Sequence, residues 1–302
     1  RAATSWGINF KAPGIYEDLA SHHLMVPMAD VAYTRIGLQT LAKDFFILGK
    51  NQISDLGIEE EFLAPVVQSL SHCTGPVIEP GADSSFYLFY CSHGKSQLIG
   101  TRALQYIHDG ETQEVSVRGK GATVTGYHNK PRIQEARRRN WYDLRTDVER
   151  RGRAEILIPR LIYQRYATIW NRAGHVPGEL FIEFIPKERY DTEVYLAILN
   201  STLMELMLRA RSQVYGGGSY NMNPGVIRSV PILYAERLSQ DDKSRLVLAY
   251  RQFLSEAKND RTGIDSAIAG VLELEASTQE KLTKSITDMR LVAASSKKSG
   301  SG

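Results

Sequence analysis

Residues 195–221, YLAILNSTLMELMLRARSQVYGGGSYN, decide the fold of this 302-residue chain. Their apolar residues recur at the three- and four-residue spacing of an amphipathic helix, and the pattern ends near Arg211. Three consecutive glycines then follow between two tyrosines, which is more than a helix C-cap requires, because one left-handed residue is enough. The stretch therefore predicts a buried helix that leads into a specialised turn.

The sequence on either side of this stretch changes in pattern. Before it, short runs rich in β-branched and aromatic residues predict strands, and prolines at positions 159, 177 and 186 predict that these strands are short or lie at an edge. After Pro231 the helical spacing continues, so we expect an α+β fold with a mixed sheet-and-helix body and a helical C-terminal layer. The predicted strands are residues 30–33, 45–48, 86–91, 156–158, 161–163 and 180–185, and the predicted helices are residues 16–22, 59–70 (interrupted at Pro65), 240–257, 264–274 and 279–292.

These changes divide the chain into four parts. Residues 1–24 contain turn signals at residues 11–14 and are expected to be a lead-in from an upstream domain. The chain opens with Arg1 and shows no basic-then-apolar leader, so we expect no signal peptide. Residues 25–234 form the mixed body and residues 235–292 the helical layer. Residues 293–302, rich in Ser, Lys and Gly, are expected to be a flexible tail.

The composition is that of an ordinary globular protein, with 42% hydrophobic and 24% charged residues, which excludes a disordered or collagen-like polymer. No apolar run is long enough to predict a membrane span. Two cysteines cannot form a disulfide framework, which favours a reducing compartment, so we expect a cytoplasmic protein.

Positive charge is concentrated in the middle of the chain. Between Arg118 and Arg172, fourteen Lys and Arg residues stand against five acids, in a chain whose net charge is only +3. Twelve of the fourteen are arginine, which pairs bidentately with phosphate and with guanine edges. The stretch predicts a surface for DNA or RNA, with a solvated charged helix as the alternative. We expect the triplet 137–139 to be free for this role, because only Glu135 lies near it in sequence.

No motif for catalysis or metal binding is complete. Gly94-Lys95-Ser96 lacks the upstream glycine of a phosphate-binding loop, and no Gly-x-Ser-x-Gly elbow occurs. His72-Cys73 and Cys91-x-His93 are the only metal-like cluster. Adjacent ligands rarely reach one ion together, so two buried thiols are favoured over a zinc site.

Two glycine-rich segments suit a nucleic acid better. Residues 118–121 (RGKG) place two cations on a flexible backbone that can approach a phosphate, with an ordinary surface loop as the alternative. Residues 215–221 (YGGGSYN) add stacking rings and an amide to exposed backbone. A tight turn packed under the sheet is the alternative for this second segment.

The order of these motifs resembles the C-terminal target-recognition (specificity) domain of TaqI-like and type IIG adenine-N6 DNA methyltransferases of restriction–modification systems. The resemblance covers about residues 25–274. Its segments, in the order of the family, are residues 30–48 (IGLQT followed by DFFIL), 58–65 (IEEEFLAP), 141–144 (WYDL), 156–159 (ILIP), 199–203 (LNSTL), 215–220 (YGGGSY) and 230–232 (VPI), with Ile264-Asp265 in the closing helix.

The resemblance implies a domain that recognises double-stranded DNA in a sequence-specific way, with residues 25–234 as the target-recognition domain. The catalytic half of the family carries an Asn/Asp-Pro-Pro-Tyr/Phe loop and a Gly-rich strand end for S-adenosylmethionine, whereas this chain contains no Pro-Pro. We therefore expect no catalytic residue, metal or cofactor in this chain. S-adenosylmethionine is expected in a catalytic methyltransferase domain or subunit that acts as its partner.

On this basis the residues that contact DNA are predicted in two groups. One group holds phosphates and the other lies near base edges, while Trp141, Tyr142 and Leu203 are expected to pack in the core. Two other functions stay open: a non-catalytic scaffold whose Arg-rich face docks an acidic partner, and a self-standing nuclease or nucleotide-processing domain. The predicted DNA contacts are Arg118, Lys120, Arg132, Arg137, Arg138 and Arg139 for phosphates, and Tyr215, Gly216, Gly217, Gly218, Tyr220 and Asn221 near base edges.

Overall fold

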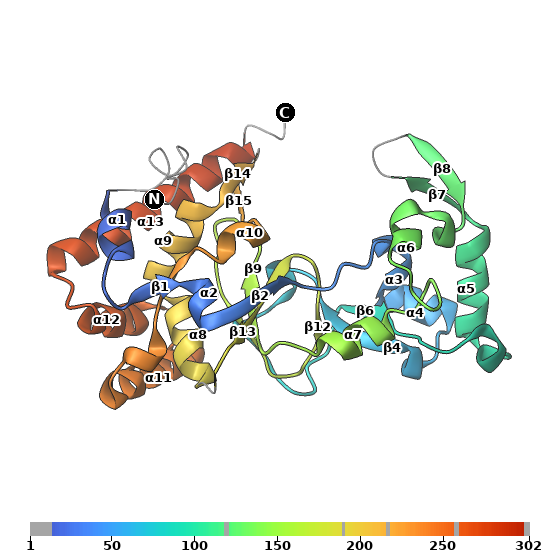
Figure 1. Ribbon diagram of the computed structural model, residues 1–302, viewed down its shortest axis with the longest axis horizontal. Helices are drawn as coiled ribbons and strands as arrows, with labels where there is room; N and C mark the ends of the chain where they lie inside the picture. The colour runs from blue at the N-terminus through green and yellow to red at the C-terminus, as the bar shows by residue number, and fades with distance from the viewer. Residues whose placement is uncertain (1–13, 118–120, 189–190, 216–217, 257–259, 299–302) are drawn as a thin grey trace.

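The computed structural model describes residues 14–117, 121–188, 191–215, 218–256 and 260–298, with the side chains of Tyr215 and residues 292–298 excepted. The chain folds into two lobes that lie on either side of an open space and are joined below it (Figure 1). Each lobe has its own hydrophobic core. The fold is α+β, as the sequence predicts. Among the described residues, every helix is too short or too polar to span a lipid bilayer.

The first lobe is built on a five-stranded sheet in the order β2-β13-β9-β11-β5. Its neighbouring strands are antiparallel except for the parallel pair of β11 and β5. The strands are β2 (Ala32–Ile36), β13 (Phe181–Pro186), β9 (Ile156–Pro159), β11 (Ile169–Asn171) and β5 (Val77–Ile78).

The three prolines of this region do not all lie in the kind of strand that the sequence predicted. Pro159 and Pro186 are the last residues of β9 and β13, which are central strands. A proline is tolerated at this position because the rest of the strand keeps its N–H groups and can pair on both sides. Pro177 does lie on an edge strand, β12 (Val176–Pro177) of the second lobe. The prediction of short or edge strands therefore holds for the edge strand β12 and for the four-residue β9, whereas β13 is a central strand of six residues.

The apolar stretch that decides the fold forms two helices, where the sequence predicted one. These are α8 (Thr192–Asn200) and α9 (Thr202–Arg211). Ser201 has an extended backbone, and its Oγ accepts a hydrogen bond from Met204 N at 3.2 Å, so it caps α9. The Asn200 amide pairs with both backbone groups of Thr168, at 2.9 and 3.1 Å, which fixes the break against the sheet.

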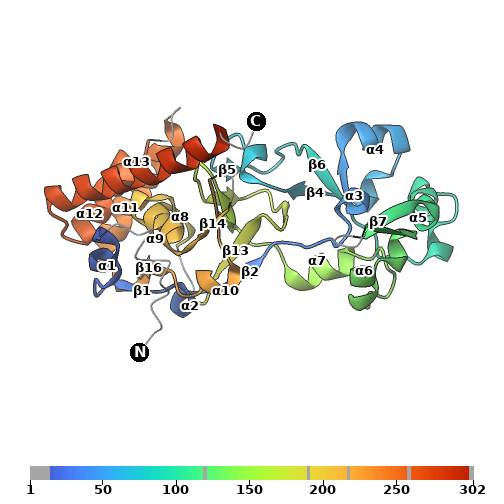
Figure 2. The same ribbon diagram turned by 90° about the horizontal axis from the view of Figure 1, so that it is seen from above.

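Three C-terminal helices cover α8 and α9 and share the core of the first lobe (Figure 2). They are α11 (Gln240–Ser255), α12 (Thr262–Val271) and α13 (Ala276–Lys298), and the first two lie close to the predicted helices. The third continues past the predicted end at residue 292, so residues 293–298, predicted as part of a flexible tail, are helical. Leu203 is buried in this core, as expected. The lobe is completed by α1 (Ile15–Ala20), α2 (Met28–Val31), α10 (Pro224–Ile227), the pair β1 (Met25–Pro27) and β16 (Pro231–Leu233), and the three strands β10 (Leu161–Ile162), β15 (Ser219–Asn221) and β14 (Gln213–Tyr215).

The second lobe packs helices around a four-stranded sheet in the order β12-β4-β6-β3. Residues 59–70, predicted as a helix, instead form a 3-10 turn (Glu60–Phe62) and the strand β4 (Leu63–Val67), because the apolar residues around Pro65 face the sheet core. Tyr142 and Trp141 pack into this core, as expected. The remaining elements are β3 (Ile47–Gly49), β6 (Phe86–Phe89), the hairpin β7 (Glu114–Val117) and β8 (Ala122–Thr125), α3 (Lys43–Phe46), α4 (Lys50–Leu56), α5 (Arg102–Thr112), α6 (Pro131–Glu135) and α7 (Arg145–Arg151).

Candidate nucleic-acid interface

An open groove of about 630 Å³ lies where the two lobes meet. Its walls are residues 34–41, which begin on β2 and lead into the second lobe, together with α7 and α10. Figure 1 shows β2 and α7 below the space between the lobes and α10 on the inner side of the first lobe. Four arginines line the groove: Arg35, Arg150, Arg151 and Arg228.

Glu183 holds two of these arginines in place. It lies on β13 directly across from Arg35 on β2, and its side chain is buried. Its Oε2 accepts hydrogen bonds from Arg35 Nε and Nη2 at 2.8 and 2.6 Å, and its Oε1 accepts one from Arg151 Nη2 at 2.7 Å. One carboxylate therefore serves two guanidiniums, which leaves one positive charge at the groove and ties α7 to the sheet.

Asp147 on α7 repeats this arrangement with Arg138 and Arg150. Its Oδ2 lies 3.0 Å from Arg138 Nε, and its Oδ1 lies 3.1 Å from Arg150 Nη2. The Arg150 side chain is 76% exposed, whereas that of Arg138 is 6% exposed and lies over the Phe46 ring. The expectation that Arg138 is free of an acidic partner is thus wrong, because the fold brings Asp147 to it, and Arg138 faces inward.

The other predicted phosphate contacts fall into two groups. Arg132 on α6 and Arg137 and Arg139 after it are exposed, and none forms an ion pair with another described residue. Arg118 and Lys120 follow β7 in sequence and lie outside the described residues.

The described residues of the glycine-rich segment belong to the first lobe. Tyr215 ends β14, and Gly218, with φ +74°, precedes β15, while Gly216 and Gly217 lie outside the described residues. Tyr220 is 4% exposed, and its hydroxyl donates to the Met289 carbonyl at 3.4 Å. This placement differs from the predicted role of Tyr220 near a base edge, because its hydroxyl bonds to α13 and the Arg209 guanidinium lies over its ring, 4.8 Å from the centroid. The half-buried Asn221 has an Oδ1 without a hydrogen-bond partner among the described residues.

Sequence reasoning missed part of this groove. Arg35 and Arg228 stand alone in sequence, and Gln39, which is exposed on the wall, gives no signal of its own. Glu183 has no acidic or metal-ligand spacing that would single it out. Only Arg150 and Arg151 belonged to the predicted basic stretch.

The two cysteines are buried and do not form a disulfide. Burial raises the pKa of the Cys73 thiol to about 11, so this thiol stays protonated at neutral pH. Within the described ranges no three His, Cys, Asp or Glu side chains are grouped so that they could hold a metal ion.

Comparison with known proteins shows which family this chain is similar to and which solved structures share its fold. The family described as "Type II methyltransferase M.Eco57I, C-terminal domain" matches residues 3–263. The type IIG restriction endonuclease BpuSI is similar in structure, with a TM-score of 0.59 and 11% identity over 95% of this chain and 33% of that chain. The type IIL restriction-modification enzyme MmeI, solved in complex with DNA, gives a TM-score of 0.56 and 11% identity over 87% of this chain and 36% of that chain.

At this identity the likeness to the two enzymes concerns the fold, and the chain spans about a third of the length of each. No curated protein matches the chain. The family match extends over most of the sequence and confirms the resemblance to a restriction–modification methyltransferase. The chain belongs to the family of type II methyltransferase C-terminal domains typified by M.Eco57I.

Proposed function

We propose that this domain binds double-stranded DNA and reads its sequence for an adenine-N6 methyltransferase, with the duplex held in the groove between the two lobes. The observation that carries the proposal is the surplus of arginine there. Glu183 and Asp147 each serve two guanidiniums, and Arg228 has no acidic partner among the described residues. DNA phosphates would supply the missing negative charge through charge-assisted hydrogen bonds.

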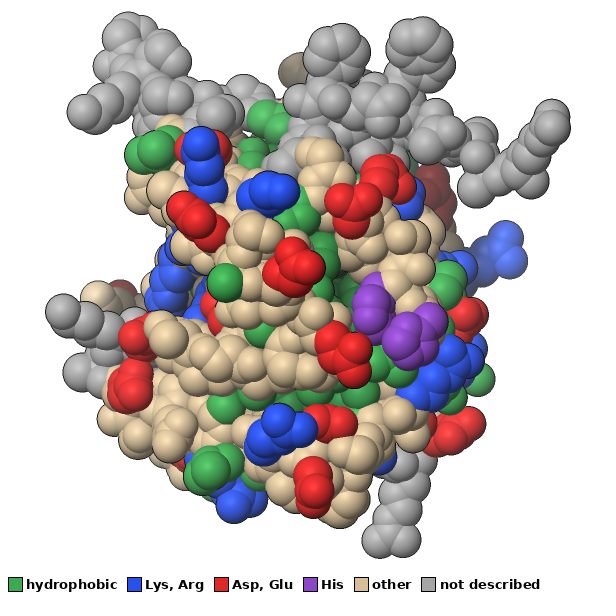
Figure 3. Space-filling view, turned by 90° about the vertical axis from the view of Figure 1, so that its left-hand side faces the viewer, with side chains coloured by type: hydrophobic (Ala, Val, Ile, Leu, Met, Phe, Trp, Pro, Cys, Tyr) green, Lys and Arg blue, Asp and Glu red, His purple; other side chains and the backbone are tan. Residues whose placement is uncertain are grey.

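The surface away from the groove differs in character. Figure 3 shows acidic and basic side chains interspersed over the outer end of the first lobe. Mixed charge of this kind is typical of an ordinary solvated surface, whereas phosphate binding needs an excess of cations over the acids beside them. The exposed Arg132, Arg137 and Arg139 would extend the phosphate-binding surface along the second lobe.

Base reading requires groups that present a donor and an acceptor together. Gln39 is exposed on the groove wall, and a Gln amide can pair with both N6 and N7 of adenine in the major groove. We therefore assign Gln39 to base reading and the surrounding arginines to positioning of the duplex.

Methyl transfer itself belongs, in this proposal, to a catalytic part of the parent protein or to a partner subunit. S-adenosylmethionine carries a sulfonium cation, and a groove with surplus guanidinium groups does not suit a cationic ligand. We therefore assign neither the cofactor nor a catalytic step to the residues of this chain.

The test uses the variant R150Q/R228Q, which removes two exposed cations and leaves Arg138 to pair with Asp147. Duplex affinity is measured by fluorescence anisotropy between about 50 and 200 mM salt. The double variant should bind at least tenfold more weakly at low salt and should reduce the slope of log affinity against log salt by about 2, because two phosphate contacts are lost.

A matched control is R245Q on α11, because Arg245 also pairs with an aspartate three residues away, Asp242, and is also exposed. This variant should bind like the parent. Equal affinity and equal salt slope for the parent and R150Q/R228Q would refute the groove as the DNA site. A parent chain that binds no duplex at low salt would favour the acidic-partner alternative.

A further inference from the structure

A second cavity, of about 650 Å³, lies between α9, α12, α13 and the segment that joins β10 to β11. It shares no lining residue with the DNA groove. Its lining combines apolar side chains with charged ones: Leu203, Phe253, Leu274 and Leu282 are apolar, Arg165, Arg261 and Arg290 are basic, and Asp260 and Asp265 are acidic. Its volume falls within the range of about 300–1,000 Å³ that is typical of small-molecule sites.

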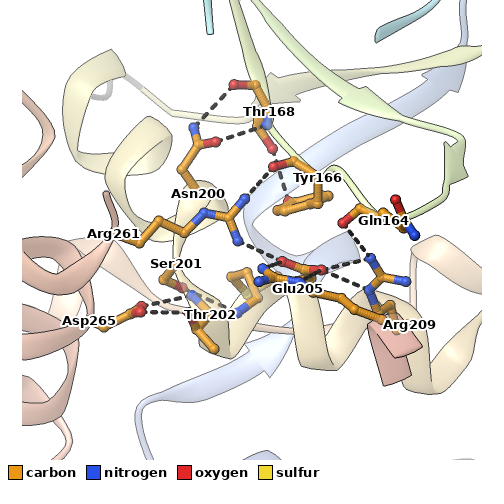
Figure 4. A network of polar contacts seen from close by, with 12 residues as sticks. Gln164, Tyr166, Thr168, Asn200, Ser201, Thr202, Glu205, Arg209, Arg261 and Asp265 are labelled. Atoms are coloured by element: carbon orange, nitrogen blue, oxygen red, sulfur yellow. Dashed lines mark hydrogen bonds and ion pairs between the residues drawn. The ribbon is translucent and has the colours of Figure 1, made fainter. Parts of the chain in front are cut away.

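Three arginines converge on one buried carboxylate, that of Glu205 on α9, and Figure 4 labels two of them, Arg209 and Arg261. Glu205 accepts hydrogen bonds from Arg209 Nε at 2.8 Å, from Arg261 Nη1 at 2.6 Å, and from Arg290 through both Nε and Nη2. Burial alone would raise the pKa of Glu205, but the surrounding arginines hold it at about 2.

This cluster has more positive than negative charge. Asp265 lies beside it, where its two oxygens accept hydrogen bonds from Thr202 N and Oγ1. Burial raises the pKa of Asp265, whereas the hydrogen bonds from Thr202 and the nearby Arg261 act in the opposite direction. Arg165 and Asp260, which also line the cavity, offset each other in charge, so one guanidinium charge stays in excess and an anion in the cavity would compensate it.

A donor is also left over on the cavity side. Arg290 uses Nε and Nη2 on Glu205, and its Nη1 has no hydrogen-bond partner among the described residues. The Arg290 side chain is 40% exposed, so this donor is within reach of a ligand. Nearby Gln279 and Thr283 on α13 add neutral polar groups to the same wall.

We propose that this cavity binds a small organic anion, with a phosphate or carboxylate group against Arg290 and Arg261 and an apolar body against Leu274 and Leu282. The site is separate from the DNA groove, so it gives the domain a second ligand. Charge-assisted hydrogen bonds fix the anionic group, and the apolar wall selects an organic ester over a free inorganic ion.

The experiment is calorimetric titration of the full chain with phenyl phosphate, and with inorganic phosphate as the second probe. Thr283→Trp fills the cavity from its exposed rim and leaves every arginine contact intact. Its matched control is Thr287→Trp, one turn further along α13, exposed and outside the cavity lining. Arg290→Gln removes the free donor while Glu205 keeps two arginines.

Phenyl phosphate should bind the parent and T287W alike, more tightly than inorganic phosphate does, and at least tenfold more weakly to T283W and R290Q. Equal titration curves for all four proteins, or no heat at millimolar phenyl phosphate, would overturn the proposal. Duplex affinity should be unchanged in T283W. If T283W loses DNA binding and no protein binds phenyl phosphate, the anion of this cluster is a DNA phosphate and the small-molecule site does not exist.

Discussion

Glu183 shows how one buried side chain can support a whole binding surface. It holds Arg35 and Arg151 side by side from two different lobes. We expect Glu183→Gln to lower the free energy of unfolding by about 2–3 kcal/mol, below the 3–5 kcal/mol usual for a fully buried pair, because both guanidiniums are about a third exposed. The measurement is urea denaturation.

The same variant should bind non-specific DNA more tightly at low salt, since the groove gains one net positive charge. Glu188→Gln, an exposed glutamate just after β13, is the control and should change neither property. A Glu183→Gln protein as stable as the parent would contradict the role of this carboxylate.

Glu205 gives a prediction about pH. Its pKa lies at about 2 in the folded chain against an ordinary value of 4.5, so its charge stabilises the fold fully above pH 4.5. That stabilisation, on the order of 3 kcal/mol, should disappear as the pH falls from 4.5 towards 2. Urea midpoints of the parent and Glu205→Gln should therefore differ by a constant amount above pH 5 and converge in acid. If the urea midpoints of the two proteins, plotted against pH, stay parallel down to pH 2, the assigned pKa is contradicted.

At the scale of the element, the passage from β2 into the second lobe depends on Gly37. A Cβ at this position would lie 2.2 Å from the Gly178 carbonyl oxygen, and Gly37 N donates to Phe181 O at 2.9 Å. Gly37→Ala should therefore force the groove wall apart and destabilise the fold by about 1–3 kcal/mol. Thermal denaturation tests this, with Gly75→Ala as control, because nothing lies within 4 Å of the Cβ it would gain. Equal melting temperatures of the Gly37→Ala and Gly75→Ala variants would contradict the close approach of Gly37 to the Gly178 carbonyl oxygen.

Elements whose pattern is local were predictable from the sequence. The helices α11 and α12 and the strands β9 and β13 match the predicted ranges to within a few residues, because each carries its own apolar period. The break between α8 and α9 was not predictable in this way, since the apolar spacing continues through it and Asn200 is fixed by a contact with the distant Thr168. The same holds for β4, which pairs with two strands across a proline.

At the scale of the whole molecule, the sequence showed that positive charge is concentrated in one stretch of the chain. It did not show which arginines the fold brings together. The groove combines Arg35, Arg150 with Arg151, and Arg228, which lie far apart in the chain. Charge counting identified only the middle pair, and it included Arg138, which the fold turns inward towards Asp147. Recognition of the family depended instead on the order of short motifs, which survives where individual site residues vary.

The central claim is that this domain reads DNA sequence, and selection of duplexes from a random pool tests it most directly. The purified chain is used at about 50 mM and at about 150 mM salt, because phosphate contacts weaken steeply over this range while base contacts do so less. The account predicts an enriched motif of several base pairs that contains an adenine and persists at the higher salt. Retention of duplexes without any motif at either salt, or no retention at all, would contradict it.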